Sequence, residues 1–290
     1  MESIQMAIDT LVEAAARRAR FVVTVALVVI TVTSWVYVLS GAGTGMTAWE
    51  MSHMGNGAVD NTVLKLMSPP REPAPMETMT ASMTAPAAWT PGYAVLMFSM
   101  WWVMMIAMML PGASPMILLF ATFNKKQREQ GNFYVPTAMF ALGYLAVWAV
   151  FSLFAAGVQW GLSGSDWFSD AMVIRSETLC AGILIAAGLY QFTSVKQACL
   201  THCRSPLHFL AHRWRSGFRG ALLMGIEHGT YCAGCCWFLM LLLFAGGVMN
   251  LYWIGGLALF VLLEKFITRP TWISQAAGGI LLIAGLVLLV

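Results

Sequence analysis

Charged residues are scarce in this sequence. Only 10% of its 290 residues are Asp, Glu, Lys or Arg, whereas a soluble domain carries roughly 25%. Hydrophobic residues make up 59%, and the mean hydropathy is +0.73. Because a soluble core cannot use that much apolar surface, the composition predicts a membrane protein. The apolar runs are about twenty residues long and do not alternate, which excludes a transmembrane barrel and predicts an all-α, polytopic transmembrane helical bundle.

Several functional signatures are also missing. The chain carries no nucleotide-binding motif, which argues against ATP-driven pumping by this chain alone, and it shows no flavin or quinone signature. The net charge of +3 does not indicate nucleic-acid binding, because the basic residues are sorted by membrane side. We therefore expect membrane lipid among the partners and no nucleic acid.

About seven spans can be identified, each long enough to cross roughly 30 Å of hydrocarbon at 1.5 Å per residue. The first follows Arg20 and is longer than a signal-peptide core, with no convincing cleavage site, so an uncleaved span is expected. The seven expected spans are 21–40, 93–119, 134–160, 178–198, 220–248, 251–267 and 272–290.

The distribution of basic residues predicts the orientation. With the N-terminus inside, only Lys65, Arg71 and Arg175 of the sixteen Lys and Arg residues fall on the outer side, as the positive-inside rule requires. We expect an integral protein of the bacterial inner (cytoplasmic) membrane. Its parts are an N-terminal segment with the first transmembrane helix (1–40), a Met-rich outer loop (41–92) and a six-helix metal-binding membrane domain (93–290).

Five of the six cysteines lie in two clusters that also contain histidine. These residue types are metal ligands, and their spacing makes both clusters candidate metal sites. The first, at the inner end of the fourth expected span, contains Cys199, His202 and Cys203. The second, inside the fifth span, contains Glu227, His228, Cys232, Cys235 and Cys236.

The second cluster has the spacing of one helix face. At about 100° per residue, His228 and the three cysteines that follow it point in similar directions. Thiolate and imidazole ligands suit a soft or borderline ion, so copper as Cu(I) is expected and zinc is the alternative. Simple packing of small apolar residues explains Cys180. It does not explain His228 and Glu227, because ionisable residues inside a span usually mark a functional site.

Two further features of the spans bear on this face. Gly225 and Gly229 form a small-xxx-small pair, which predicts close packing of a neighbouring helix. In the sixth span, Lys265 is a candidate to neutralise Glu227 or Glu264, which would create a polar layer in the inner half of the bundle. The alternative is an ordinary helix end with a snorkelling lysine.

Methionines form a stripe along the second expected span. Thioether ligands select Cu(I), so Met104 and Met108 are candidate ligands on a path for a soft metal. Met105 and Met109 broaden the apolar face and favour plain packing instead. The stripe consists of Met97, Met100, Met104 and Met108, and the 41–92 loop, which shows no helical or alternating periodicity, adds Met46, Met51, His53, Met54, Met67, Met76, Met79 and Met83.

Three segments of the sequence resemble a known family, the predicted metal-binding integral membrane proteins defined by a domain of unknown function. They are the run from Met97 through Ala-Met-Met-Leu-Pro at 107–111, the segment 199–206 with Cys-x-x-His-Cys, and the segment 229–240 with Cys-Ala-Gly-Cys-Cys-Trp. The resemblance covers roughly residues 91–290. It implies metal binding in a helical membrane domain by the cysteines of both clusters, and it gives neither the metal nor a reaction.

Three functions fit these observations. The first is a membrane protein that handles Cu(I), by transport or by delivery to a client metalloenzyme. The second is a metal-bearing or scaffolding subunit of a larger membrane enzyme complex. The third is a membrane thiol-disulfide oxidoreductase that uses the same cysteines, so enzymatic activity is left open.

Overall fold

The computed structural model describes residues 2–44, 47–54, 89–129, 137–163, 174, 176–267 and 271–289. These residues form helices and no strand, so the all-α prediction is confirmed for the described part of the chain. The helices are α1 Glu2–Leu39, α2 Ala48–Met54, α4 Pro91–Glu129, α5 Thr137–Leu162, α6 Glu177–Gln191, α7 Ser194–Arg204, α8 Pro206–Arg213, α9 Gly217–Gly246, α10 Leu251–Phe266 and α11 Thr271–Val287.

Four of these helices, α1, α4, α5 and α9, contain an apolar stretch long enough to cross a membrane. The number becomes five if the bent pair α6 and α7 is one span. Helix α11 is apolar but has only 17 residues. Seven spans and an inside N-terminus therefore remain predictions.

The fourth expected span is not one helix. The expected span 178–198 contains a break, because α6 ends at Gln191 and α7 starts at Ser194, bent by 63°. Thr193 causes the new start: its backbone is extended and its hydroxyl accepts a hydrogen bond from the Lys196 amide at 3.3 Å, as in a helix N-cap. Helix α7 is thereby turned onto α9.

The Met-rich segment also differs from the expectation at one place. Helix α2 forms at Ala48–Met54, within the stretch that shows no helical periodicity. It is tied to the start of α10, because the Ser52 hydroxyl accepts a hydrogen bond from the Leu251 amide at 2.7 Å. Met46 and residues 55–88, with Met67, Met76, Met79 and Met83, lie outside the described residues.

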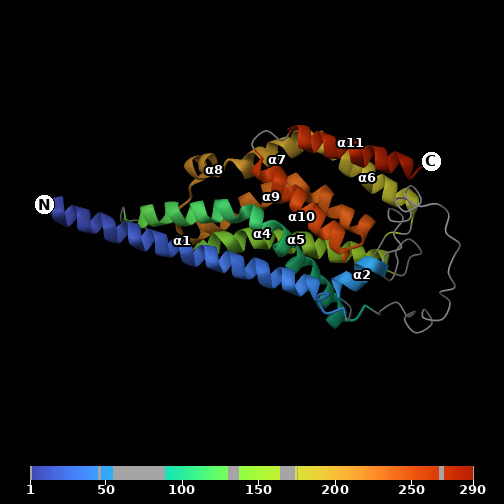
Figure 1. Ribbon diagram of the computed structural model, residues 1–290, viewed down its shortest axis with the longest axis horizontal. Coiled ribbons are helices and arrows are strands. Elements are labelled where there is room, and N and C mark those ends of the chain that lie inside the picture. Colours follow the sequence, from blue (N-terminus) through green and yellow to red (C-terminus); the bar gives the residue numbers. More distant parts are fainter. Residues whose placement is uncertain are drawn as a thin grey trace.

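The long helices run side by side, with α1 packed on α4 and α11 packed on α6 at the opposite edge (Figure 1). Helices α5 and α9 lie against each other through glycine. A Cβ atom on Gly143 would lie 2.2 Å from the Leu222 carbonyl oxygen, and one on Gly225 would lie 2.0 Å from the Phe140 carbonyl oxygen. The predicted close approach at Gly225 is confirmed, and it fixes the α9 face that carries the cysteines.

Gly225→Ala is expected to lower the free energy of unfolding by about 1–3 kcal/mol, the usual cost of forcing extra carbon into a packed interior. The two backbones must separate to admit the methyl group. Gly157→Ala on α5 is the matched control, because a Cβ at Gly157 meets nothing within 4 Å. Thermal unfolding of the two purified variants in detergent measures the difference. Equal melting temperatures would contradict the close approach.

Candidate metal centre

Helix α9 turns its cysteines inward. His228 is 3% exposed, Cys235 is 1% exposed, and Cys232 and Cys236 are fully buried. The four residues follow the helical spacing expected from the sequence, so the prediction that they share one face is confirmed. This face meets Tyr144 of α5, Met109 of α4 and Cys203 of α7.

The Cys232 thiol is surrounded by polar groups. Its Sγ accepts a hydrogen bond from Lys265 Nζ at 3.1 Å and lies 3.2 Å from the Tyr144 hydroxyl. Lys265 reaches this point from α10 by crossing α4 at Gly112, where a Cβ atom would lie 2.9 Å from Lys265 Cδ. A cation beside the sulfur favours its thiolate form, which is the form that binds metals.

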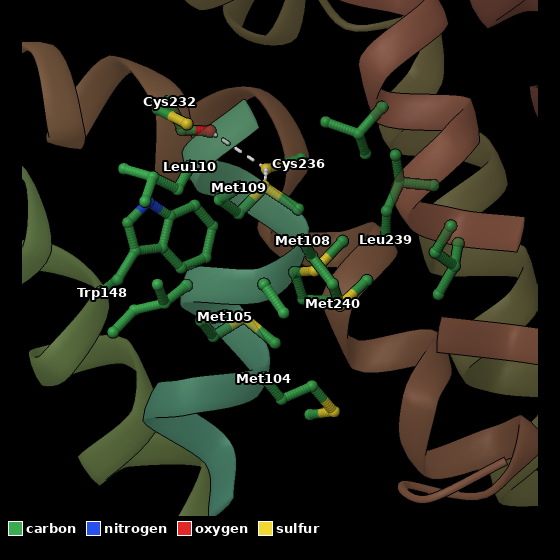
Figure 2. Packing of buried hydrophobic residues seen from close by; sticks show 14 of the residues in the cluster. Met104, Met105, Met108, Met109, Leu110, Trp148, Cys232, Cys236, Leu239 and Met240 are labelled. Carbon is green, nitrogen blue, oxygen red and sulfur yellow. Dashed lines mark hydrogen bonds between the residues drawn. The ribbon is translucent and has the colours of Figure 1, made fainter. Parts of the chain in front are cut away.

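The other two thiols of α9 have backbone and thioether partners. Cys235 Sγ and Cys236 Sγ donate to the Cys232 carbonyl oxygen at 3.0 and 3.1 Å. Cys236 Sγ also lies 3.9 Å from Met109 Sδ (Figure 2). Across the residues that the structure describes, no three or more His, Cys, Asp or Glu side chains converge as a ready metal site.

The two sequence clusters meet in space. The bend at Thr193 brings α7 against α9, where Cys203 lies beside Cys232 and Cys235. Cys199 Sγ touches the same helix, since a Cβ atom on Gly234 would lie 2.8 Å from it. Cys199 and Cys203 are partly exposed, whereas the α9 thiols are buried. The five sulfurs therefore form one group that extends from the surface to the interior.

The predicted histidine ligands have different surroundings. The His202 ring stacks on Tyr231 with centroids 4.3 Å apart. The His228 ring is buried among Phe140, Tyr144 and Phe209, and in the described part of the chain its Nδ1 atom has no hydrogen-bond partner. A buried nitrogen without a partner is unusual, and it leaves His228 able to accept a metal ion.

Acidic residues near the thiols are already paired. Glu227 forms ion pairs with Arg213 and with Arg215, the latter at 3.6 Å. The prediction that Lys265 neutralises Glu227 or Glu264 is wrong, because Lys265 contacts Cys232.

Met104 and Met108 are both buried on α4, and their role as ligands stays a prediction.

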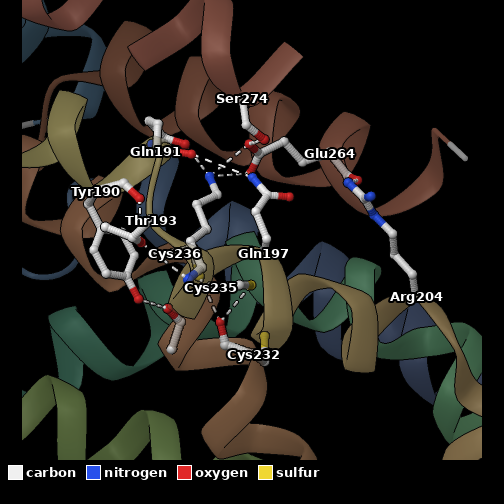
Figure 3. A network of polar contacts seen from close by, with 12 residues as sticks. Tyr190, Gln191, Thr193, Gln197, Arg204, Cys232, Cys235, Cys236, Glu264 and Ser274 are labelled. Atoms are coloured by element: carbon white, nitrogen blue, oxygen red, sulfur yellow. Dashed lines mark hydrogen bonds and ion pairs between the residues drawn. The ribbon is translucent and has the colours of Figure 1, made fainter. Parts of the chain in front are cut away.

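Sequence reasoning missed Lys196 as the partner of Glu264. Both side chains are buried, and Lys196 Nζ lies 2.7 Å from Glu264 Oε1. Ser274 donates to the same oxygen at 2.6 Å, and Gln191 also accepts from the lysine (Figure 3). The pair joins α7 to α10 beside the thiols. The local signal for this pair is Thr193, the N-cap of the helix that carries Lys196. Threonine is also common inside transmembrane helices, so the signal is weak.

One family matches the chain. The PpoB2 family, described as copper chaperone, matches residues 98–288. The chain belongs to this copper chaperone family. The match includes every predicted ligand of both clusters, together with Met104 and Met108. No curated protein and no solved structure matches the chain.

The membership identifies copper as the metal of this protein, as the donor types predict. Thiolate and thioether sulfurs are soft ligands and select Cu(I). The group supplies five thiols, and Met109 adds a thioether beside Cys236. Lys265 places a positive charge at Cys232, which would offset the negative charge of thiolates that bound a Cu(I) ion there.

Proposed function

We propose that this copper chaperone is an integral membrane protein that holds Cu(I) on the α9 thiols and delivers it to a client metalloenzyme. The observation that supports delivery is the continuous group of sulfurs from partly exposed Cys199 and Cys203 to buried Cys232, Cys235 and Cys236. Copper passes between proteins by ligand exchange, which needs an accessible thiol at the start. In this proposal Cys203 makes the exchange and the α9 thiols retain the ion.

Insertion into a membrane is supported by the outer faces of the helices. Large apolar side chains are exposed there, including Val150 at 69% and Ile283 at 65%, and lipid tails would cover them. We propose the inner membrane of a bacterium, with the N-terminus inside. The bent pair α6 and α7 then serves as one span, and the short helices α10 and α11 complete the seven.

The methionines of α4 are proposed as the route by which Cu(I) reaches the thiols from the outer side. Their side chains are fully or almost fully buried along one helix. The route consists of Met97, Met100, Met104 and Met108.

A copper-bearing subunit of a larger membrane enzyme is the second candidate. The observation in its favour is the complete burial of Cys232 and Cys236, because a structural or enzymatic metal is held in a closed site. A subunit keeps its copper, whereas a chaperone gives it up. An oxidoreductase that uses the same cysteines is the third candidate, and a mixed disulfide caught at one of them by thiol trapping would support it.

Copper transfer separates these candidates. The full chain is purified from the membrane fraction in detergent, loaded anaerobically with Cu(I) and mixed with excess chromophoric Cu(I) chelator. Transfer complete within minutes would support the chaperone, and retention for hours would support the subunit. A protein that takes up no copper, or that leaves the membrane without detergent, would contradict the proposal.

Cys203→Ser is expected to leave the copper content near that of the wild type and to slow the transfer about tenfold, equivalent to about 1.4 kcal/mol on the barrier. The reason is that the variant loses the partly exposed thiol that lies beside Cys232 and Cys235 but keeps the buried thiols of α9. Stopped-flow absorbance of the chelator complex measures the rate. Cys180→Ser is the control, because Cys180 is buried on α6 outside the sulfur group. An unchanged rate in Cys203→Ser would exclude Cys203 from the exchange.

A further inference from the structure

Met109 is held at the sulfur group by both its side chain and its backbone. Its Sδ atom lies 3.9 Å from Cys236 Sγ. Its carbonyl oxygen accepts a hydrogen bond at 3.1 Å from the Tyr144 hydroxyl, which also contacts Cys232. The side chain is fully buried, and Figure 2 shows it pointing toward Cys236 from α4. Met109 therefore has a fixed position next to the Cys236 thiol of α9, and Tyr144 links its backbone to Cys232.

The separation of the two sulfurs matches that of two ligands of one ion. With metal–sulfur bonds of about 2.3 Å, as in zinc–thiolate sites, two sulfurs lie about 3.8 Å apart around a tetrahedral ion and about 4.0 Å apart around a trigonal one. The observed 3.9 Å lies between these values. The spacing of the Cys236 and Met109 sulfurs is therefore compatible with coordination of one ion.

We propose that Met109 is a ligand of the Cu(I) ion held by the α9 thiols, and that its thioether sets the preference of the site for Cu(I) over Zn(II). The inference rests on the proposed copper site and adds the residue that gives it selectivity. A thioether is soft and uncharged, so it stabilises Cu(I), whereas Zn(II) takes thiolate, imidazole or carboxylate ligands. The site then combines cysteine ligands from α9 with one methionine from α4.

Paired affinity measurements test selectivity. Met109→Leu conserves volume and is expected to weaken Cu(I) binding about tenfold, equivalent to about 1.4 kcal/mol, with Zn(II) binding unchanged within about twofold. Met105→Leu is the matched control, since Met105 is fully buried one turn earlier on α4, and it should change neither affinity. Equal losses in both variants, or parallel losses of Cu(I) and Zn(II) binding in Met109→Leu, would overturn the proposal.

Selenium gives a direct readout of coordination. Protein grown with selenomethionine and loaded with Cu(I) is expected to show a Cu–Se distance in copper-edge X-ray absorption. The Cu–Se signal should disappear in Met109→Leu and persist in the control Met105→Leu. A Cu–Se signal that survives in Met109→Leu, or is absent from copper-loaded wild type, would overturn the role of Met109 and leave the proposed function intact. Wild type that binds no Cu(I) would overturn both.

Discussion

Copper binding is expected to fall on the order of 100-fold when Cys232 and Cys235 are both replaced by Ser. The two residues are adjacent on the buried face of α9, and Cys203 lies beside both of them. A serine oxygen is a hard donor that serves Cu(I) poorly. It can still donate to the Cys232 carbonyl, as the Cys235 thiol does at 3.0 Å, so the fold should persist. Competition with a chromophoric Cu(I) chelator measures the affinity.

Cys180→Ser controls for the loss of a buried cysteine as such, because Cys180 is fully buried on α6. Its copper affinity should equal that of the wild type. The melting temperature of each variant in detergent shows that the fold is retained. Unchanged copper stoichiometry and affinity in the double variant would contradict the assignment of the site to α9.

Lys196→Met is expected to destabilise the protein by about 3–5 kcal/mol, the typical cost of removing one partner of a buried ion pair. The variant leaves the Glu264 carboxylate buried without its ammonium partner, while the Ser274 hydroxyl still donates to it. The double variant Lys196→Met with Glu264→Leu should recover most of the loss, because no unpaired charge remains. Thermal or denaturant unfolding in detergent measures the three proteins.

Arg213→Met provides the contrast for this prediction. Its ion pair with Glu227 is partly exposed, with Arg213 48% accessible, and Arg215 also pairs with Glu227. Removing such a pair should cost less than about 1 kcal/mol. Similar losses of unfolding free energy in Lys196→Met and Arg213→Met would show that the buried pair stabilises the fold no more than the partly exposed pair does.

The same pair bears on the copper site because Lys196 lies on α7, the helix that carries Cys199 and Cys203. Glu264 on α10 holds one end of α7, and the Arg204 guanidinium donates to the Glu264 carbonyl oxygen at the other end (Figure 3). These contacts keep α7 against α9. The two clusters stay together because of this buried network, in which no metal ligand takes part.

Local periodicity was enough to predict the α9 half of the site. His228, Cys232, Cys235 and Cys236 share a face because residues three and four apart are neighbours on any helix, and burial of that face follows from the close packing at Gly225. The all-helical character also follows from composition and from the length of the apolar runs. These are properties of a single helix, so they can be read from the sequence.

Contacts between helices could not be read in the same way. Helical angles along α4 favoured Met104 and Met108 as ligands and assigned Met109 to packing, yet Met109 is the methionine that contacts Cys236. Lys265 was a candidate partner of Glu264 by adjacency, whereas Lys196 takes that place from a different helix. The rotation of each helix about its axis decides such pairs, and that rotation depends on the packing of all its neighbours.

The sequence by itself determined that this chain is helical and strongly apolar, that its metal is soft, and which side of α9 carries the thiols. Only the tertiary structure decided that both clusters form one group of sulfurs, that Lys265 contacts Cys232, and that Met109 contacts Cys236. The two clusters meet because of the bend at Thr193, whereas the contacts of Lys265 and Met109 depend on how α10 and α4 pack against α9. The chain changes direction by 63° at the bend. The hydrogen bond that the Thr193 hydroxyl accepts cannot be recognised from a single threonine in an apolar run.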